Sequence, residues 1–515
     1  MKILLVYSPR PYWPFLHEQD NFMVPQNLVY LAGAARKEKF DVKISDCMPL
    51  KIGYKSLERL IREYNPDIVA VGENHALYAE NALQVCRISK SVSPKIKTIV
   101  GGTHFSNTLE LTLADRSVDF IVIGEGEAVF VNLLKAISGG SNNYEAIRGI
   151  AFHPRIIGSY QNAAIIQTPP ERLIENLDNL GIPAYDLLRM DLYGKSKYLF
   201  SPGGTTIHHG RGCTGACPFC AFWVQMADRK IVDGKIQIKP RYRTRSPEMV
   251  LEEVEILKKD YGKSALVFVD ETFNLDPNWS DVFAEGLLKR NLNINFFAFM
   301  RADLIVRDEM SGIMEKLVRA GLRHVCVGVE RSEDSELKEM KKTFYSSGTS
   351  RQAFEILNKK YPEVFRQATF IVGIRDESKE SMKRLESFVK KMNFDFPAFH
   401  PLTPVPGTPL WEEAKQEGWL EVTDFNEFDW STPVMPSKYL SRYEIEDLSY
   451  QITRKSMTLS WYLKGIFSPH QYRRRMYIWW SIVSIKVFLN NILRRINPFK
   501  VKSYHNLVYP EWYDK

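Results

Sequence analysis

Three cysteines in one short stretch have the residue type and spacing best suited to chemistry. Residues 210–220 read GRGCTGACPFC and place Cys213, Cys217 and Cys220 at C-x3-C-x2-C spacing inside a glycine-rich loop. Iron–sulfur clusters usually take four cysteine ligands. Because no fourth cysteine lies nearby in the sequence, we expect one cluster in which one iron keeps a position for another ligand. The alternatives are three structural cysteines or a zinc site, but zinc prefers four closed ligands.

The remaining cysteines, Cys47, Cys86 and Cys326, each stand among apolar residues and are predicted to be buried packing residues. The first residues, MKILLVY, read as a strand and lack the features of a cleaved secretory signal. An oxygen-sensitive cluster and few cysteines are typical of a reducing compartment. The sequence therefore predicts a cytoplasmic protein.

The length and the charge of the chain limit the classes of protein to which it can belong. A chain of 515 residues has room for two or three domains, each with a buried core. The net charge is +8, yet ten of the 69 lysines and arginines lie within residues 451–500, which hold no aspartate or glutamate. The rest of the chain, with 59 basic and 61 acidic residues, is close to neutral. We therefore expect a local C-terminal surface that meets something anionic, and no general affinity for nucleic acid.

Residues 1–139 alternate short β-branched runs with amphipathic helical stretches. This rhythm predicts a doubly wound parallel α/β sheet, in which ligands bind beyond the carboxyl ends of the strands. Small residues stand at those ends, so a large flat ligand can approach the backbone. The expected strands are 3–7, 42–44, 67–71, 98–100 and 119–123, and the expected helices are 25–37, 57–64, 78–91 and one from Glu127.

A second α/β region follows a Gly/Ser/Asn break at residues 138–143. We expect residues 140–200 to form a connector over the substrate cavity. From residue 205 a β-then-α rhythm repeats six times, which is typical of a partial (βα)6 TIM-like barrel over residues 201–410. The expected strands are 205–209, 265–269, 294–300, 324–329, 368–372 and 398–402, and the expected helices are 247–260, 279–289, 310–320, 351–360 and 379–391.

Charged residues follow three of the barrel strands, where catalytic groups of such barrels gather. The second strand ends in Asp270 and Glu271, two carboxylates that can hold an ammonium group and ribose hydroxyls; helix capping is the alternative. The third strand ends before Arg301, and the fourth ends in the stretch from Gly328 to Glu330. For Arg301 and Glu330 a surface salt bridge is the alternative role.

The cysteine spacing, with Phe219 immediately before the last cysteine, resembles the signature of the radical S-adenosylmethionine superfamily. The resemblance implies a [4Fe-4S] cluster whose open iron holds the amino and carboxylate groups of S-adenosylmethionine. An electron from the cluster then releases a 5'-deoxyadenosyl radical, which abstracts hydrogen from unactivated carbon. A flavodoxin- or ferredoxin-type protein is the implied electron donor. The implied contacts with S-adenosylmethionine are Asp270 and Glu271 for the amine, Arg301 for the carboxylate, Gly328 and Glu330 near the nucleoside, and Phe219 against adenine.

Five strands, a Gly-Gly pair after the fourth and a Gly-Glu-Gly-Glu stretch after the fifth resemble the cobalamin-binding domain that precedes the barrel in a large subgroup of these enzymes. The Asp-x-His-x-x-Gly segment that donates a histidine to cobalt in other cobalamin proteins is absent, so the resemblance implies a corrin without that ligand. His75 and His104 are candidate neighbours of the corrin, although a lone loop histidine is more often a surface residue. An empty Rossmann-like domain is the alternative. The implied cobalamin-binding residues are Asn74, His75, Gly101, Gly102, Thr103, Gly124, Glu125 and Gly126.

Residues 411–515 are predicted to form a helical region with a basic aromatic tail. The stretch 472–489 is strongly apolar with arginines near its start, and Arg494 and Arg495 follow it. Its apolar run is too short to span a bilayer and is interrupted by Lys486. Two interpretations stay open. One is a peripheral helix on anionic lipid or beside a hydrophobic substrate, and the other is a helix packed on the barrel with solvated arginines.

Four stretches of sequence point to a particular group within this superfamily. FCAFW at 219–223, PRYRTRSPE at 240–248, AGLRHV at 320–325 and TPVM at 432–435, followed by the basic tail, are similar to the anaerobic magnesium-protoporphyrin IX monomethyl ester cyclase group. This resemblance implies oxidative ring closure on a large hydrophobic substrate, a porphyrin or a lipid, with oxygen supplied by water.

Three other activities compete with a cyclase. A cobalamin-dependent C-methyltransferase acting on a tetrapyrrole or lipid needs the same residues. An RNA methylthiotransferase carries a second cysteine set in its N-terminal domain, where this chain has only the separated Cys47 and Cys86. A cobalamin-sensing module without catalysis is disfavoured by the intact cysteine triad.

Overall fold

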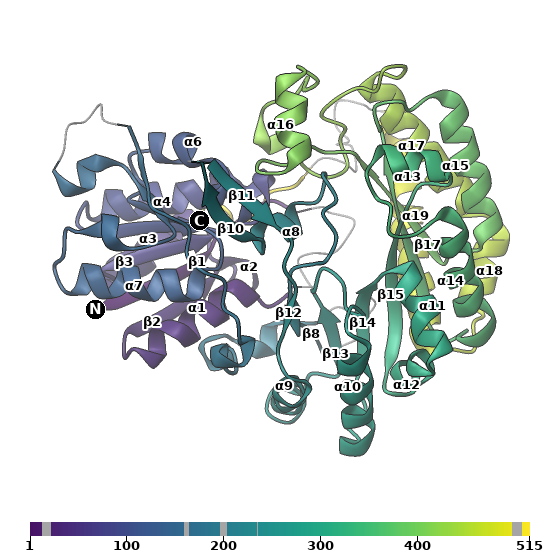
Figure 1. Cartoon of the computed structure of the whole chain (residues 1–515), viewed down its shortest axis with the longest axis horizontal. Helices are drawn as coiled ribbons and strands as arrows, with labels where there is room; N and C mark the ends of the chain where they lie inside the picture. The colour runs from purple at the N-terminus through teal and green to yellow at the C-terminus, as the bar shows by residue number, and fades with distance from the viewer. Residues whose placement is uncertain (13–21, 159–163, 196–202, 234, 497–506) are drawn as a thin grey trace.

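The computed structural model describes residues 1–12, 22–158, 164–195, 203–233, 235–496 and 507–515. Figure 1 shows two α/β units side by side, an N-terminal sheet and a second sheet that we call the barrel, with the C-terminal helices on the far flank of the barrel. The predicted junction between connector and barrel, near residue 200, lies outside the described residues.

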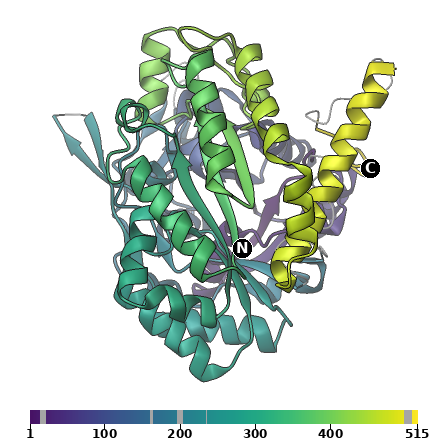
Figure 2. The same cartoon turned by 90° about the vertical axis from the view of Figure 1, so that its right-hand side faces the viewer.

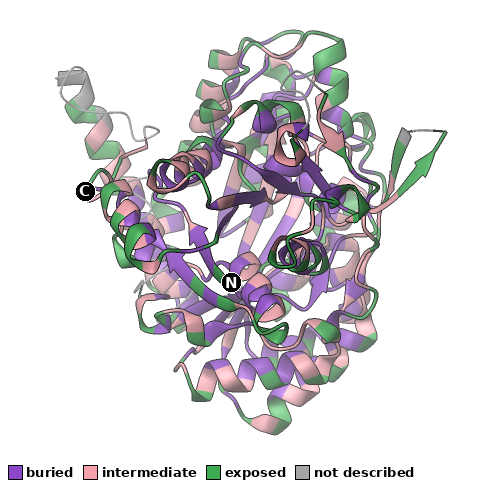
Figure 3. Ribbon diagram, turned by 90° about the vertical axis from the view of Figure 1, so that its left-hand side faces the viewer, coloured by how far each residue is buried: buried purple, intermediate pink, exposed green. Residues whose placement is uncertain are grey.

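The N-terminal sheet begins with five parallel strands in the order β2-β1-β3-β4-β5. Its strands are largely buried, as parallel strands between two helix layers require (Figure 3). Apolar residues of one face belong to a cluster that continues into the barrel core, and those of the other face form a cluster within the N-terminal unit. The predicted doubly wound sheet is confirmed. Its strands are β1 (Lys2–Tyr7), β2 (Asp41–Asp46), β3 (Ile68–Gly72), β4 (Lys97–Gly101) and β5 (Phe120–Val122), and its helices are α1 (Gln26–Lys37), α2 (Cys47–Leu50), α3 (Tyr54–Tyr64), η1 (Ala76–Tyr78), α4 (Ala79–Val92), α5 (Thr103–Ser106), α6 (Leu109–Ala114) and α7 (Gly126–Ser138).

Two further strands extend this sheet. β6 (Ile150–Phe152) pairs antiparallel with β5, and β7 (Ile166–Gln167) pairs antiparallel with β6. Both come from the stretch predicted as a connector, so part of that stretch continues the N-terminal sheet. Short 3-10 helices occupy much of the rest: η2 (Tyr144–Ala146), η3 (Pro154–Ile157), η4 (Leu177–Leu180), η5 (Tyr185–Leu187) and η6 (Met190–Leu192).

The barrel is the predicted open sheet of six parallel strands, in the order β8-β13-β14-β15-β16-β17. One difference concerns residues 310–320, predicted as one helix. Gly312 has a left-handed φ of 76° and separates two helices there. The strands are β8 (Gly204–Ile207), β13 (Ala265–Phe268), β14 (Asn295–Met300), β15 (Leu322–Glu330), β16 (Phe365–Val372) and β17 (Phe396–Pro401), and the helices are α9 (Pro247–Lys259), α10 (Pro277–Arg290), α11 (Ala302–Met310), α12 (Ile313–Arg319), α13 (Asp334–Glu339), α14 (Ser347–Lys360), α15 (Lys379–Met392) and α16 (Pro409–Gln416).

A β-hairpin that the sequence analysis missed follows the cysteine loop. Its strands β10 (Asp228–Val232) and β11 (Lys235–Lys239) pair antiparallel. An Asp-Gly pair between isoleucine-rich runs was the available sequence signal. Before the loop, β9 (Gly210–Arg211) pairs antiparallel with β12 (Arg243–Thr244), and the short helix α8 (Ala221–Gln225) follows the last cysteine.

The C-terminal helices α17 (Arg442–Ser456), α18 (Leu459–Ile466) and α19 (Gln471–Ile496) follow η7 (Phe425–Glu427). The buried carboxylate of Asp395, just before β17, holds α19 on the barrel. It accepts hydrogen bonds from Arg366 at 2.8 Å, from Arg473 at 2.6 Å and from the Tyr477 hydroxyl at 2.5 Å. The first half of α19 is therefore a helix packed on the barrel.

The second half of α19 stands clear of the barrel (Figure 2). Ile485, Phe488, Leu489, Ile492 and Leu493 are between 40% and 63% exposed there. They occupy positions i, i+3, i+4, i+7 and i+8 and so share one helix face. In the described part of the chain, no helix combines the length and the apolar character needed to cross a membrane.

Candidate active site

The cysteine loop follows β8 and β9 at the carboxyl end of the barrel sheet and ends at α8. Cys217 is buried, and Cys213 and Cys220 are partly exposed. The Gly215 N–H group donates to the sulfur of Cys213 at 3.3 Å, and the Trp223 indole N–H donates to the carbonyl of Cys217 at 2.9 Å. These bonds hold the three thiols on one short, preorganised segment.

Glycine is required at the start of this loop. Gly212 has a φ of 83°, and a side-chain carbon there would lie 1.9 Å from the carbonyl oxygen of Arg241. A side-chain carbon at Gly215 would come within 3.1 Å of the Phe344 ring. At Gly212 only glycine combines a left-handed backbone with such close approach, and at Gly215 the lack of a side chain leaves room for the Phe344 ring. The two glycines therefore fix the position of Cys213, which lies between them.

The chemistry of these thiols suits a cluster. Burial raises the pKa of Cys217 to about 11 and that of Cys220 to about 12, so the free thiols are protonated at neutral pH and binding iron displaces the proton. In an iron–sulfur cluster the thiolates bind different irons. Within the described ranges, no three His, Cys, Asp or Glu side chains converge on a single metal ion.

The other three cysteines lie in hydrophobic clusters, as predicted. Cys47 and Cys86 share a cluster on one face of the N-terminal sheet, and Cys326 packs inside the barrel sheet. Burial raises the pKa of all three thiols. Cys47 and Cys86 thus serve as core residues, which leaves the methylthiotransferase alternative without its second cysteine set.

Asp270 and Glu271 bind the backbone that leads into the first cysteine. One Asp270 oxygen accepts the N–H groups of His209 at 2.9 Å and Gly210 at 2.6 Å, and Glu271 accepts that of Gly212 at 2.9 Å. The second Asp270 oxygen is buried and has no hydrogen-bond partner among the described residues. Such an orphan acceptor fits a bound ammonium or hydroxyl group. Partial burial raises the pKa of Glu271 to about 7.

Arg301, directly after β14, reaches the cysteine loop. Its guanidinium donates to Asp303 at 2.6 and 3.0 Å and to the hydroxyl of Thr214 at 3.3 Å. It also lies 4.4 Å from the centroid of the Phe344 ring. A planar guanidinium that faces the loop suits a carboxylate ligand, which is the role predicted for it.

Glu330 ends β15 with a φ of 64°, where the register between β15 and β16 shifts. Non-glycine residues in this conformation are strained and gather at functional sites. The Glu330 carboxylate pairs with Lys342 at 2.5 Å, and the lysine also donates to the Gly328 carbonyl at 3.3 Å. Burial alone would lower the pKa of Lys342, but the Glu330 carboxylate raises it above its usual value. Lys342 belongs to no motif, and sequence reasoning missed it.

Phe219 is part of the cysteine loop, directly before Cys220. The Pro218 carbonyl beside it accepts the N–H of Leu410 at 3.0 Å, which ties the loop to α16. The predicted contact of Phe219 with adenine stays a prediction. The ring is partly buried against an apolar cluster made of Met340, Ile374, Leu402, Leu410 and Met435.

In the N-terminal sheet, the loops after β3 and β4 are joined. The Asn74 side-chain oxygen accepts the Thr103 N–H at 3.1 Å. Gly102 has a φ of 97°, and a side-chain carbon there would lie 2.4 Å from the Glu73 carbonyl oxygen. The second glycine of the Gly-Gly pair therefore lets the two loops meet. Asn74 and His75 are exposed beside this junction.

His104 is buried at the same edge. Burial lowers its pKa to about 4, so the ring is neutral. Its Nδ1 atom has no hydrogen-bond partner in the described structure. The rings of Phe105 and Phe425 lie edge-on to it, with centroids 5.3 and 4.9 Å away. A buried nitrogen without a partner fits a polar group of a ligand at this edge.

The Gly-Glu-Gly-Glu stretch after β5 faces the barrel. Glu125 pairs with Arg211 at 3.2 Å and with Arg243 at 2.9 Å, and Glu127 pairs with Arg211 at 2.5 Å. Although burial opposes it, the two arginines hold the pKa of Glu125 below its usual range. The Glu125 carboxylate is thus occupied by arginines of the barrel, a partnership that the sequence analysis did not foresee.

The remaining predicted glycines lie close to neighbouring groups. A side-chain carbon would come within 3.3 Å of the Val122 carbonyl at Gly101 and within 3.2 Å of Leu31 at Gly126. Gly124 has a φ of 80° and faces the guanidinium of Arg229, which is part of the hairpin. Small residues here allow helix, hairpin and strand ends to meet.

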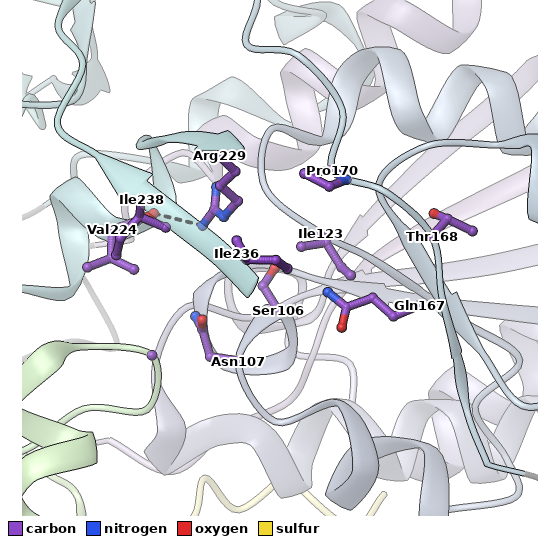
Figure 4. A pocket seen from close by; sticks show the side chains of 11 residues that line it. Ser106, Asn107, Ile123, Gln167, Thr168, Pro170, Val224, Arg229, Ile236 and Ile238 are labelled. Carbon is purple, nitrogen blue, oxygen red and sulfur yellow. Dashed lines mark hydrogen bonds between the residues drawn. The ribbon is translucent and has the colours of Figure 1, made fainter. Parts of the chain in front are cut away.

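A cavity of about 200 Å³ lies between the N-terminal sheet and the hairpin (Figure 4). Ser106, Asn107 and Ile123 line it near the carboxyl ends of β4 and β5, and Ile236 and Ile238 line it from β11. Its walls come from both α/β units, at the edge where doubly wound sheets bind ligands. The cavity is small beside a corrin and has room for only part of one.

Two protein families match this chain: the B12 binding domain over residues 14–134 and the Radical SAM superfamily over residues 207–389. An uncharacterised methyltransferase of Pyrococcus horikoshii is 30% identical over 481 residues, which cover 91% of this chain and 95% of that protein. The anaerobic magnesium-protoporphyrin IX monomethyl ester cyclase of Rubrivivax gelatinosus is 28% identical over 92% of this chain and 80% of that protein.

A solved structure shares the fold. TsrM from Kitasatospora setae, a radical S-adenosylmethionine methyltransferase with cobalamin and a [4Fe-4S] cluster bound, superimposes with a TM-score of 0.67. The match covers 94% of this chain and 98% of that chain at 16% identity. The chain belongs to the cobalamin-binding radical S-adenosylmethionine enzymes. Its cofactors are cobalamin, a [4Fe-4S] cluster and S-adenosylmethionine, as predicted, so the zinc-site and empty-domain alternatives are set aside.

Proposed function

We propose that this enzyme starts a radical reaction at an unactivated carbon of a large hydrophobic substrate of the tetrapyrrole class, and that the outcome is an oxidative ring closure. The observation that carries the proposal is the similarity to the Rubrivivax cyclase over 92% of the chain, which includes both α/β units and C-terminal helices. The similarity therefore extends beyond the radical barrel to the cobalamin-binding unit and the C-terminal helices.

The cysteine loop and the strand ends around it would hold the first two cofactors. When bound, the cluster supplies the electron that cleaves S-adenosylmethionine. The orphan oxygen of Asp270 and the carboxylate of Glu271 would receive the methionyl ammonium, and Arg301 would pair with the carboxylate. Cys213, Cys217 and Cys220 are the cluster ligands; Gly328, Glu330 and Phe219 would contact the nucleoside.

Lys342 has a role of its own in this arrangement. Its ammonium group lowers the pKa of Cys217, although burial raises that pKa more strongly. The same ammonium group pairs with Glu330. Lys342 would therefore balance the negative charge of the thiolate and of Glu330 in a site from which water is largely excluded.

The loops after β3, β4 and β5 would hold cobalamin against the barrel. Asn74 and His75 offer exposed polar groups, Thr103 lies beside them, and His104 offers a neutral nitrogen without a partner in the described structure. Gly101, Gly102, Gly124 and Gly126 keep this edge free of side chains, and Glu125 would act through its backbone.

Products separate the proposed reaction from its rival. Enzyme reconstituted under anaerobic conditions would be supplied with S-adenosylmethionine, a reductant and magnesium-protoporphyrin IX monomethyl ester in ¹⁸O-labelled water. Ring closure predicts 5'-deoxyadenosine, no matching S-adenosylhomocysteine, and a product that carries the label. Unlabelled product, or S-adenosylhomocysteine formed in step with product, would contradict it.

Transfer of a methyl group to a substrate carbon is a second candidate. The Pyrococcus relative favours it, because that protein is named a methyltransferase and is 30% identical over 95% of its length. The reaction would use the same residues but consume a second S-adenosylmethionine for the methyl group. The expected signature is S-adenosylhomocysteine and 5'-deoxyadenosine in equal amounts, and a product heavier by one methylene.

A hydrophobic substrate also gives the second half of α19 a role. We propose that its apolar face, made of the five residues named above, contacts anionic lipid. The contact is supported by the absence of acidic residues from 451–500, which hold ten lysines and arginines. Electrons would come from a flavodoxin- or ferredoxin-type protein.

A further inference from the structure

Four buried charged side chains connect the two α/β units beside the cysteine loop. Glu125 and Glu127 come from the N-terminal sheet, and Arg211 and Arg243 come from β9 and β12 of the barrel. Each side chain is between 4% and 9% exposed. Buried ion pairs at this depth contribute little net stability compared with apolar packing, but they tolerate only a narrow geometry.

The barrel end of this connection is coupled to the first cysteine. Only Gly212 separates Arg211 from Cys213. The backbone of Gly212 is confined by the Arg241 carbonyl, and its N–H group is held by Glu271 at 2.9 Å. A displacement of Arg211 is therefore passed on to Cys213 rather than absorbed by a flexible linker.

A second contact joins the other end of the cysteine loop to the same stretch. The Gln225 side chain, in the helix that follows Cys220, donates to the Gly124 carbonyl at 2.9 Å. Arg243 also donates to the Ile174 carbonyl at 2.7 Å, which anchors β12 to the chain that follows the N-terminal sheet. The cysteine loop is thus fastened to the Gly-Glu-Gly-Glu stretch on both sides.

We propose that these ion pairs set the position of the cobalamin-binding edge relative to the cysteine loop, so that Glu125, Glu127, Arg211 and Arg243 are positioning residues. The Gly-Glu-Gly-Glu stretch directly follows β5, whose carboxyl end is part of that edge. Radical reactions between separately bound groups depend strongly on distance, and a misplacement of about 1 Å can cost about 100-fold in rate. The proposal rests on the two cofactors and holds for ring closure and methyl transfer alike.

The test measures the relation between the two cofactors in the holoenzyme without substrate. Reduced cluster and cob(II)alamin each carry an unpaired electron, so their magnetic interaction in electron paramagnetic resonance reports their separation. Glu127→Gln removes one charge of the connection. Arg211→Lys keeps the charge but loses the rigid, planar set of donors with which the guanidinium pairs with Glu125 and Glu127. Asp119→Asn is the matched control, because Asp119 is a buried carboxylate at the opposite end of β5, paired with Lys90 at 2.5 Å.

Glu127→Gln and Arg211→Lys are expected to weaken or broaden the magnetic interaction while cobalamin and iron contents stay at wild-type levels. With substrate, both should form several-fold more 5'-deoxyadenosine per product than wild type, because the radical is made but used less efficiently. Asp119→Asn should leave both readouts unchanged.

Three results would overturn the proposal. The first is a wild-type magnetic interaction in both connection variants, and the second is an equal change in Asp119→Asn. The third is loss of cobalamin from Glu127→Gln, which would mean that the carboxylate binds the cofactor itself. If Glu127→Gln does not fold, the magnetic interaction measured in Arg211→Lys decides whether the proposal holds. Since the spectrum needs no substrate, it can fail while the proposed reaction stands.

Discussion

At the residue scale, three charged side chains beside the cysteines hold the loop in place, in addition to the ligand contacts that we propose for them. Asp270 and Glu271 accept backbone N–H groups that lead into Cys213, and Arg301 donates to Thr214. Replacing any of these side chains should therefore disturb the cluster loop together with the S-adenosylmethionine binding that we propose for them. A loss of activity in such a variant does not by itself assign a ligand contact, and cluster content needs to be measured beside it.

Cys217→Ala provides the direct residue-scale prediction. It removes one of three thiolates from the loop, so we expect cleavage of S-adenosylmethionine to fall below detection. Cobalamin should stay bound, because its predicted site lies in the N-terminal sheet. Iron content, 5'-deoxyadenosine formation and the cobalamin absorption spectrum measure the three quantities.

Cys326→Ala is the control for this change. Cys326 is buried in the barrel sheet outside the loop, so its replacement should cost some stability through a small cavity but leave cleavage intact. Loss of cobalamin together with the cluster in Cys217→Ala would contradict the separation of the two sites.

At the scale of elements, α19 is an anchored helix with a free end. Asp395 binds Arg366, Arg473 and Tyr477, and the helix leaves the barrel after this network. Of the two interpretations that the sequence left open, packing on the barrel holds for the first half of α19, and the lipid contact is the role we propose for its second half.

Asp395→Asn tests the anchor. It leaves two arginines without their buried anion, which typically costs about 3–5 kcal/mol. Although burial opposes it, Arg366 and Arg473 lower the pKa of Asp395 to about 2. A carboxylate with a lowered pKa stabilises the fold above its unfolded pKa and loses that effect as the pH falls toward its folded pKa. The difference in thermal unfolding midpoint between variant and wild type should be full at neutral pH and shrink below about pH 4. A difference that does not change with pH would rule out the ionised carboxylate as the cause.

The free end of α19 carries the lipid prediction. Phe488→Ser with Leu489→Ser removes two large apolar side chains, 63% and 51% exposed, without touching the anchor. Co-sedimentation with anionic vesicles should fall several-fold. Val282→Ser, which changes an exposed apolar residue on α10, should leave it unchanged. Equal binding by the α19 variant and wild type would reject the lipid contact.

Much of this element-scale structure followed from the sequence, for physical reasons. Period-two and period-3.6 patterns gave both parallel sheets, because buried strands and amphipathic helices leave strong local signals. The sequence analysis did not predict the helix break at Gly312 or the strands β6 and β7. A single left-handed glycine and strands of two or three residues leave only weak signals in the sequence.

At the scale of the whole molecule, function depends on how two α/β units meet. Glu125 and Arg211 are 86 residues apart in sequence, and their pairing is set by the packing of the units. The cysteine triad could be recognised from spacing alone, because its ligands are local. Sequence alone could not predict the ion pairs of the Gly-Glu-Gly-Glu stretch or the Glu330–Lys342 pair. A local pattern does not show which charged residue a carboxylate will face in the folded chain.

The central claim is that the cysteine loop leaves one iron of a [4Fe-4S] cluster open to S-adenosylmethionine. Electron–nuclear double resonance on the reduced cluster with ¹⁵N- and ¹⁷O-labelled S-adenosylmethionine tests it most directly. We predict hyperfine coupling from both the methionyl nitrogen and the carboxylate oxygen to the cluster. Absence of both couplings in protein with full iron content would contradict the claim, as would a metal content of zinc in place of iron.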